Sequence, residues 1–400
     1  MEQFDFDKVV ERRGTDCVKW DTLPDDEVLP LWVADMDFEV APCIRQAIAE
    51  RAAHGVYGYT LRTEAYNEAL INWFRDRHQW TIEKAWILPT TGVIPALSCV
   101  LRALTLPGDK VLMHTPVYDC FYATLKNSGC EVLESPLSRV GDSYAIDFDA
   151  FERLCAEEHP ALYLLCNPHN PAGRVWTREE LTRISTICHR HQVCVVADEI
   201  HCEIVMPGHT YTPFATVSSE AQAESVVLNS PSKAFNIAGL HTANIVCSDV
   251  RLRRQLQRAI QQHQVGQANP FGPVALQAAY NEGADWLDAL NAYLYDNYLA
   301  LRTFFAEYLP KIEVLRLEGT YLVWADCTAL EFTSDELADK LLHEAKVRVN
   351  SGTMYGKRTG QGYLRINIAC PRKQLMDALT RIGRVLSPYM EDDFSLGCPM

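Results

Sequence analysis

The segment Asn229–Leu240 carries a lysine in a position that favours covalent chemistry. Lys233 follows an apolar run that ends at Leu228, so we expect it at the carboxyl end of a strand, where α/β sheets bind their ligands. A lysine amine attacks an aldehyde once its surroundings lower its pKa. The hydroxyls of Ser230 and Ser232 flank Lys233 and are suited to a phosphate. Taken alone, the pattern favours a surface lysine, so the other motifs must decide.

A second apolar run, Val193–Ala197, ends at Asp198 and Glu199. Asp198 would lie at the same sheet edge as Lys233. Pyridoxal 5'-phosphate (PLP) accepts electrons efficiently only while its pyridine nitrogen is protonated, and a carboxylate paired with that nitrogen supplies the needed charge. We therefore predict that Lys233 holds PLP as a Schiff base and that Asp198 pairs with the ring. Glu199 would point to the other face, and we interpret it as a structural carboxylate of a loop or helix cap.

Two further runs end in candidate contacts for the cofactor. The turn Asn167–Pro171 fixes Asn170, whose amide can donate to the phenolic oxygen of PLP. Tyr118 follows another run, and its ring can stack on the pyridine ring. We expect both side chains to contact the substrate as well. The alternatives are that Asn170 only builds the turn and that Tyr118 is a core tyrosine.

The phosphate and the substrate need their own partners. Gly92 precedes an apolar helical pattern, so the backbone amides of Gly92, Val93 and Ile94 would face an anion. Arg365 lies among apolar residues of a strand-like segment, and a buried guanidinium requires an anion. The α-carboxylate of an amino acid fits it as a planar, bidentate partner. On an exposed strand edge, Arg365 would be an ordinary surface charge.

These residues depend on a parallel sheet covered by helices. The clearest apolar runs are Val111–His114, Ala161–Cys166, Val193–Ala197 and Ser225–Leu228. Thr177 and Glu180 form a capping box that starts a helix between two of these strands. The pattern predicts an α/β fold with an N-terminal arm that wraps the surface near the small domain (1–45), a large domain (46–286) and a smaller α+β domain (287–392), which begins with a long helix through Phe305.

Composition narrows the partners and the location. The formal net charge is -15 and no basic block offsets it, so we expect no nucleic-acid partner. Met1–Arg13 has no continuous apolar core, so neither a signal peptide nor a membrane span is expected, and we predict a cytoplasmic protein. The 14 cysteines contain no Cys-x-x-Cys pair, which favours free thiols. Histidine and cysteine show no zinc-site spacing, so no metal is expected.

In this order and spacing, the motifs resemble fold-type I PLP enzymes of the aminotransferase superfamily, whose large domain has a mostly parallel seven-stranded sheet. Four segments are similar to the MalY/PatB cystathionine β-lyase (C–S lyase) family: Leu31–Phe38, Gly55–Thr60, Asn167–Pro171 and Asp198–His201. The resemblance implies a homodimer in which Tyr57 reaches the phosphate of the neighbouring subunit, with Tyr59 as a companion. It also places His201 against the cofactor, where aminotransferases usually have a tyrosine.

Besides His201, two further positions of the cofactor pocket depart from the wider aminotransferase pattern. His241 stands where those enzymes carry a phosphate-binding arginine, so the phosphate has one cation fewer and the serines and helix amides must contribute more. Ala172 replaces a common threonine, which we expect to be mild.

The resemblance implies α,β-elimination from cystathionine or cysteine, which yields a thiol, pyruvate and ammonia, with Lys233 as the general base. An aminotransferase is the main alternative, because the same carbanion can be reprotonated on the cofactor. The second alternative is a lyase that also acts as a regulatory protein by binding a protein partner. The pocket beyond Cβ, which sets the substrate, would include Trp32, Ala34 and the Tyr355 loop.

Overall fold

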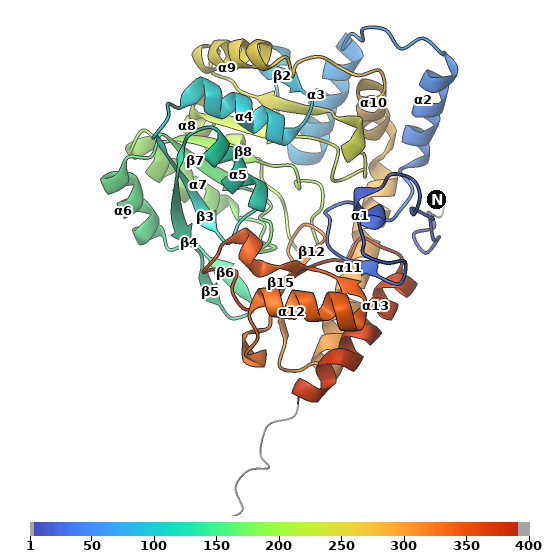
Figure 1. Ribbon diagram of the computed structural model, residues 1–400. Helices are drawn as coiled ribbons and strands as arrows, with labels where there is room; N and C mark the ends of the chain where they lie inside the picture. Colours follow the sequence, from blue (N-terminus) through green and yellow to red (C-terminus); the bar gives the residue numbers. More distant parts are fainter. Residues whose placement is uncertain (1–3, 391–400) are drawn as a thin grey trace, which may run out of the picture.

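The computed structural model describes residues 4–390, so residues 391 and 392 of the proposed small domain and residues 1–3 of the arm lie outside the described part. A seven-stranded sheet, in the upper half of the view in Figure 1, forms the centre of the larger part of the molecule. Its strands, in spatial order, are β2 (Ile87–Thr90), β10 (Ala243–Val246), β9 (Ser225–Asn229), β8 (Cys194–Asp198), β7 (Leu162–Cys166), β3 (Lys110–Thr115) and β4 (Glu131–Pro136). Neighbouring strands from β9 to β4 run parallel, while β10 runs antiparallel to both β9 and β2. The predicted mostly parallel sheet and its four clearest strands are confirmed.

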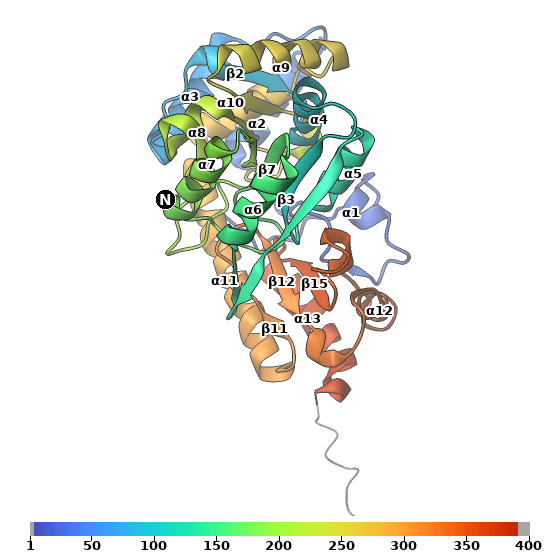
Figure 2. The same ribbon diagram turned by 90° about the vertical axis from the view of Figure 1, so that its left-hand side faces the viewer.

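Helices cover both faces of this sheet, because its strands are apolar on both sides. In β7, Leu162 and Leu164 pack with one buried cluster, whereas Tyr163 and Leu165 pack with the other. Figure 2 shows α4 and α5 on one side of the sheet and α7 and α8 on the other. The helices around this sheet are α2 (Pro42–Ala53), α3 (Glu64–His78), α4 (Val93–Leu104), α5 (Asp119–Asn127), α6 (Phe148–Glu158), α7 (Arg178–Arg190), α8 (Ser219–Glu224), α9 (Val250–His263) and α10 (Gly272–Glu282).

The helix predicted from its capping box is α7. The Thr177 side chain accepts from the Glu180 amide, and the Glu180 carboxylate accepts from the Thr177 amide. Two polar backbone groups at the helix start are thereby satisfied, which is why this pattern could be recognised in the sequence.

The second sheet is antiparallel and four-stranded. Its order is β11 (Glu313–Val314), β12 (Leu322–Asp326), β15 (Tyr363–Asn367) and β14 (Asn350–Ser351). It packs with α11 (Ala284–Tyr308), α12 (Ser334–Lys340), the π-helical turn Leu341–Ala345 and α13 (Arg372–Leu386). The hairpin β5 (Ser138–Val140) and β6 (Ser143–Ala145) and six short 3-10 turns complete the described part: Lys84–Trp86, Phe214–Thr216, Ala238–Leu240, Thr328–Leu330, Gly352–Tyr355 and Ser387–Tyr389. The boundaries that we propose at 45/46 and 286/287 fall within α2 and α11, respectively.

Before α2, the described part of the N-terminal arm contains α1 (Val18–Asp21) and β1 (Leu29–Pro30), and β1 pairs in parallel with β13 (Val347–Arg348). The arm therefore pairs with the segment that directly precedes β14, and part of it is buried rather than laid over the surface. Leu31 and Met36 are fully buried, and the buried Asp37 pairs with Lys19 at 2.9 Å. This ion pair anchors the inner part of the arm, which the low periodicity of the segment did not reveal.

Candidate active site

Ten of the predicted site residues line one cavity of about 270 Å³, around the carboxyl ends of β7, β8 and β9. They are Gly92, Val93, Ile94, Tyr118, Asn170, Asp198, His201, Ser230, Ser232 and Lys233. Parallel strands end at a common sheet edge, so residues that follow different strands meet there. Residues that the sequence did not single out also line the cavity: Thr91, Pro95, Cys166, Ile200, Ala238 and Thr242.

Lys233 enters the cavity from the turn after β9. Its Nζ donates to the Ala34 carbonyl of the arm at 2.6 Å. Burial lowers the pKa of Lys233 to about 8, with a further contribution from the positive charge of Arg365. The unprotonated fraction of this amine near neutral pH is therefore much larger than that of an ordinary lysine, and attack on an aldehyde requires the unprotonated form.

Asp198 and His201 lie on either side of the turn after β8. The Asp198 carboxyl is buried, and its Oδ1 accepts from the Ile200 amide at 3.1 Å. Burial raises the pKa of Asp198 to about 7. His201 is also buried, and burial, followed by the charges of Lys233 and Arg365, lowers its pKa to about 3. Its imidazole is therefore neutral, and its buried Nδ1 has no hydrogen-bond partner within residues 4–390.

Arg365 lies on β15, between β12 and β14, so the alternative of an exposed strand edge is wrong. Its Nη2 donates to the Trp32 carbonyl at 2.7 Å, and its Nη1 donates to Asn170 Oδ1 at 3.3 Å. The guanidinium also lies 4.7 Å from the centre of the Tyr355 ring. Among the described residues no carboxylate forms an ion pair with Arg365, and its Nε is buried without a partner. A buried cation with a free donor beside Asn170 is suited to a substrate carboxylate.

The start of α4 and the turn after β9 form another end of the cavity. Gly92 precedes α4, and the first amides of a helix have no acceptor within the helix. The Ser230 hydroxyl, in contrast, donates to the Thr242 carbonyl at 2.7 Å and accepts from the Ser232 amide at 3.0 Å. Because its single proton is already used, we assign Ser230 to shaping the turn and propose Ser232 and the helix amides as phosphate donors.

The three tyrosines differ in position. Tyr118 lines the cavity, and burial raises the pKa of its hydroxyl above the usual range. Tyr57 is 53% exposed, and its hydroxyl donates to the Ala52 carbonyl at 2.6 Å. Tyr59 is fully exposed. Neither Tyr57 nor Tyr59 lines the cavity of its own chain, so a role in cofactor binding requires a second subunit.

Sequence reasoning missed Tyr321, which is fully buried. Its hydroxyl donates to the Ala34 carbonyl at 2.9 Å, so this oxygen accepts from both Tyr321 and Lys233. The Tyr321 ring also meets the His201 ring edge-on, with 6.0 Å between their centres. No local pattern marks Tyr321, because its place beside Lys233 follows from the packing of the two sheets.

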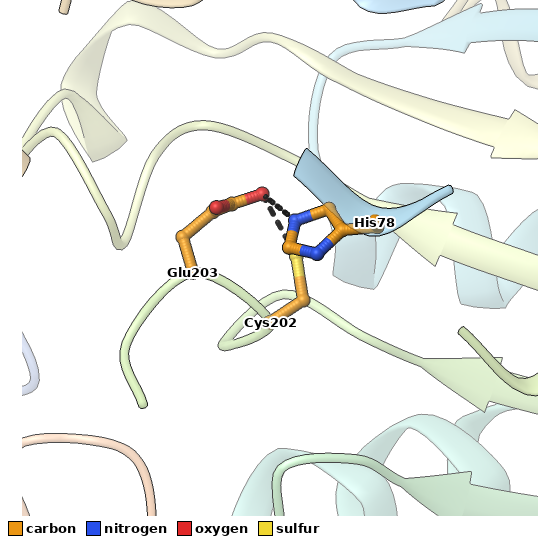
Figure 3. Close-up of side chains that lie close together, drawn as sticks. All are labelled: His78, Cys202 and Glu203. Atoms are coloured by element: carbon orange, nitrogen blue, oxygen red, sulfur yellow. Dashed lines mark hydrogen bonds and ion pairs between the residues drawn. The ribbon is translucent and has the colours of Figure 1, made fainter. Parts of the chain in front are cut away.

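Outside this cavity, His78, Cys202 and Glu203 bring three metal-ligand atoms within 4.8 Å of one another (Figure 3). Glu203 Oε1 already accepts from Trp73 Nε1 and pairs with His78 Nε2, each at 2.7 Å, and Arg77 Nε lies 3.4 Å from Oε2. Although burial alone would raise the pKa of Glu203, these partners lower it below its usual value. We interpret the cluster as an ion-pair network that anchors the loop after His201.

Glu199 has the structural role that its position suggested. Its Oε1 accepts from the Phe214 amide at 2.8 Å and from Asn167 Nδ2 at 3.3 Å, and its other oxygen accepts from the Tyr211 hydroxyl. The carboxylate therefore connects the turn after β7 with the segment around residue 214.

The chemistry of the cavity fits PLP. Lys233 offers an amine to the aldehyde, and the buried Asp198 offers a negative charge to the ring nitrogen. The unpartnered His201 Nδ1 and the amides at the start of α4 offer polar contacts for a ring oxygen and a phosphate. A carbon side chain at Gly92 would stand 3.2 Å from Pro95 Cδ, a close contact that glycine avoids at the start of α4.

A family model described as "Aminotransferase class I and II" matches residues 26–382. The chain belongs to this family. Cystathionine beta-lyase PatB of Bacillus subtilis (strain 168) is 39% identical over 386 residues, which are 96% of this chain and 100% of PatB. Protein MalY of Escherichia coli (strain K12) is 34% identical over 93% of this chain and 96% of its own length. The resemblance to the MalY/PatB group is confirmed.

A solved structure also matches the fold. A PLP-bound putative aminotransferase from Clostridium difficile 630 superposes with a TM-score of 0.93 and 38% identity, covering 96% of this chain and 100% of that one. The predicted fold-type I architecture is therefore confirmed.

Proposed function

We propose that this chain is a PLP-dependent carbon–sulfur β-lyase that cleaves L-cystathionine or L-cysteine-type substrates to a thiol, pyruvate and ammonia. The observation that carries the proposal is that Lys233 and Asp198 meet at the carboxyl edge of the seven-stranded sheet, beside Asn170, which accepts a hydrogen bond from Arg365 of the four-stranded sheet. The similarity to PatB over nearly the whole chain favours elimination at sulfur as the reaction.

The substrate's two charged groups are recognised separately. The Arg365 guanidinium, held by the Trp32 carbonyl and Asn170, binds the α-carboxylate. The Tyr355 ring lies 4.7 Å from the guanidinium and supports it through a cation–π contact. The Cα–H bond is thereby fixed relative to Lys233, because the carboxylate and amine of one amino acid define its orientation.

Lys233 moves the protons. Bound PLP supplies an aldehyde for the substrate amine and a ring that accepts the negative charge developed at Cα. With a pKa of about 8, Lys233 Nζ takes the Cα proton as a general base. The resulting ammonium then gives a proton to the sulfur as the Cβ–S bond breaks. Water hydrolyses the remaining three-carbon amine to pyruvate and ammonia, which balances the reaction.

Replacing Lys233 tests the assignment. Lys233→Ala should abolish both the visible absorbance of lysine-bound PLP and pyruvate release from cystathionine, because among residues 4–390 Lys233 is the lysine that lines this cavity. Lys84→Ala is the control, since Lys84 is an exposed lysine paired with Glu64. Retention of the absorbance or of turnover by Lys233→Ala would refute the assignment of Lys233.

An aminotransferase is the second candidate, favoured by the description of the C. difficile structure. The two reactions differ in product. The lyase releases pyruvate from cystathionine without a second substrate, whereas an aminotransferase forms glutamate from an amino acid and 2-oxoglutarate. Parallel assays of the two products with one preparation decide between them, and faster glutamate formation would contradict the lyase.

We also propose that the protein is a homodimer and lies in the cytoplasm. The loop between α2 and α3 exposes four large apolar side chains, Val56, Tyr57, Tyr59 and Leu61, at 53% or more of their surface. Such a patch is typical of an interface, and it supports the role of the partner's loop in cofactor binding. All 13 cysteines of the described part are free, which suits a reducing compartment. Within residues 4–390, no helix has the length and apolar character to cross a membrane.

A further inference from the structure

The Ala34 carbonyl, which accepts from Lys233, lies at the apex of a tight turn of the arm. The Asp35 amide donates to the Val33 carbonyl at 2.9 Å, and this bond closes a three-residue turn around Ala34. Ala34 lines the cavity, and its oxygen accepts from Lys233 Nζ at 2.6 Å and from the Tyr321 hydroxyl at 2.9 Å. The direction of this oxygen therefore depends on how the turn is held.

One side chain of the smaller sheet holds both ends of this turn. Asn367 is the last residue of β15 and is 1% exposed. Its Nδ2 donates to the Val33 carbonyl at 2.5 Å and to the Asp35 carbonyl at 2.7 Å, which uses both protons of the amide. Its Oδ1 accepts from the Ala369 amide at 2.7 Å. The peptide group that carries the Ala34 oxygen lies between the two that Asn367 binds, so its orientation is fixed from both sides.

Lys233 needs such an acceptor in the proposed reaction. When the substrate amine replaces Lys233 on the cofactor, the lysine amine is set free beside Cα of the substrate. A neutral amine that donates one N–H to a fixed oxygen has a restricted orientation, and its lone pair is then available in a defined direction for the proton that it removes. After the transfer, the same oxygen accepts from the ammonium, and hydrogen bonds of charged groups are the stronger ones.

We propose that Asn367 is a positioning residue of the reaction: by holding the turn around Ala34, it presents the carbonyl that orients the freed Lys233 amine toward the substrate. This inference rests on the proposed role of Lys233 as the general base. Arg365 stands two positions earlier on the same strand and donates to the Trp32 carbonyl at 2.7 Å. One strand therefore holds the arm both at the proposed carboxylate site and at the lysine.

A second asparagine with the same bonding pattern offers a matched control. Asn297 of α11 is fully buried, and its Nδ2 donates to the carbonyls of Ile368 and Cys370, each at 2.9 Å. Its Oδ1 accepts from Arg372 Nε at 2.5 Å. None of these partners is among the described residues that line the cavity. Asn297→Ala and Asn367→Ala each remove three buried hydrogen bonds, so both should lower the melting temperature, while only Asn367→Ala releases the turn at the cavity.

The test follows the Lys233 amine itself in protein freed of PLP. Brief labelling with acetic anhydride at a series of pH values, followed by mass spectrometry of the peptide that contains Lys233, measures the fraction of unprotonated amine. The wild type should show a midpoint near pH 8, as the lowered pKa of Lys233 requires. In Asn367→Ala the ammonium loses a well-placed acceptor, so the midpoint should fall by about one pH unit. Asn297→Ala should keep the midpoint of the wild type.

The other charged and titratable groups around Lys233 are unchanged in both variants, so a difference between the variants isolates the effect of the turn. These groups belong to Arg365 on β15, Asp35 in the arm, Asp198 at the end of β8, His201 in the loop after it, Cys120 on α5 and Tyr321 beside the Ala34 oxygen. Should Asn367→Ala fail to fold, Asn367→Ser and Asn297→Ser are compared in the same way.

Turnover with bound PLP gives a second measurement. Asn367→Ala should release pyruvate from cystathionine with a kcat about tenfold lower and a KM within about threefold of the wild type, because Arg365 still binds the carboxylate. Equal labelling midpoints of the wild type and Asn367→Ala, or the same shift in Asn297→Ala, would overturn the proposal. Absence of pyruvate from the wild type would contradict the proposed function instead, because the labelling of Lys233, which decides the role of Asn367, needs neither PLP nor substrate.

Discussion

Two buried aspartates of this protein should respond in opposite ways to the same substitution. Asp198 and Asp37 are each 3% exposed. Asp37 is surrounded by donors and cations: it pairs with Lys19 at 2.9 Å and Arg12 at 2.7 Å, and it accepts from Trp20 Nε1 at 2.9 Å. Asp198 has only the Ile200 amide as a hydrogen-bond donor among the described residues. Replacement by asparagine removes the charge and keeps the shape and one acceptor oxygen.

The direction of the stability change in Asp198→Asn follows from the pKa of Asp198, which burial raises from 3.8 to about 7. Since the folded protein binds this proton more tightly than the unfolded chain, wild-type stability is lost as the pH rises through this interval. A shift of this size corresponds to about 4 kcal/mol at pH values above 7. In protein freed of PLP, Asp198→Asn should therefore raise the melting temperature at pH 8 by several degrees, and by less at pH 5.5, although it should weaken PLP binding.

For Asp37, burial alone would raise the pKa, but Lys19, Trp20 and Arg12 lower it below its usual value. Asp37→Asn leaves the fully buried Lys19 without its closest counter-charge, which costs about 3 to 5 kcal/mol. This variant should melt at a lower temperature than the wild type at neutral pH.

Differential scanning fluorimetry of the wild type and both variants, across pH 5 to 8 and with or without added PLP, measures these effects. The expected result is a melting temperature of Asp198→Asn that exceeds that of the wild type by a margin that grows with pH. A melting temperature of Asp198→Asn below that of the wild type at pH 8 without PLP, or an effect independent of pH, would contradict the raised pKa of Asp198 in the cofactor-free protein.

Further predictions concern the substrate carboxylate and the environment of Lys233. In absorbance titrations, Arg365→Gln should bind L-alanine about 100-fold more weakly than the wild type, because two charge-assisted hydrogen bonds to the carboxylate are lost. The binding of ethylamine, which has no carboxylate, should be unchanged. An equal loss of affinity for both ligands would argue against the carboxylate contact. PLP uptake by the cofactor-free protein should become faster as the pH rises to about 8, where Lys233 loses its proton; a rate independent of pH would contradict the lowered pKa. In Tyr321→Phe, the Ala34 carbonyl accepts from the Lys233 ammonium without competition from the tyrosine hydroxyl, so the pH midpoint of PLP uptake should rise. An unchanged midpoint would show that Tyr321 does not act through Ala34.

The sheet and the residues at its edge could be predicted because their signals are local. Apolar runs of strand length end at Cys166, Asp198 and Leu228, and parallel strands bring such ends together whatever the surrounding detail. The capping box of α7 is equally local, since its two hydrogen bonds join residues three positions apart. Patterns of this kind need no knowledge of the tertiary structure.

The contacts that set the chemistry of Lys233 could not be predicted in this way. Its partner at the Ala34 carbonyl is 199 positions away, and Ala34 lies in an arm whose path depends on the buried ion pair of Lys19 and Asp37. The use of the Ser230 hydroxyl for the Thr242 carbonyl is also invisible in the sequence, because a serine beside a lysine suits a phosphate and a turn equally well.

The pKa shifts of Lys233 and Asp198 have one physical origin. Burial lowers the pKa of the amine and raises that of the carboxyl, so in each case the neutral form is favoured. The cofactor would use the two effects differently: its aldehyde needs the neutral amine, whereas its protonated ring nitrogen would restore the charge of the carboxylate. Burial of these two groups lowers the folding stability of the protein without PLP, and the binding of PLP restores that stability. PLP affinity is thereby linked to the same desolvation that makes Lys233 a nucleophile.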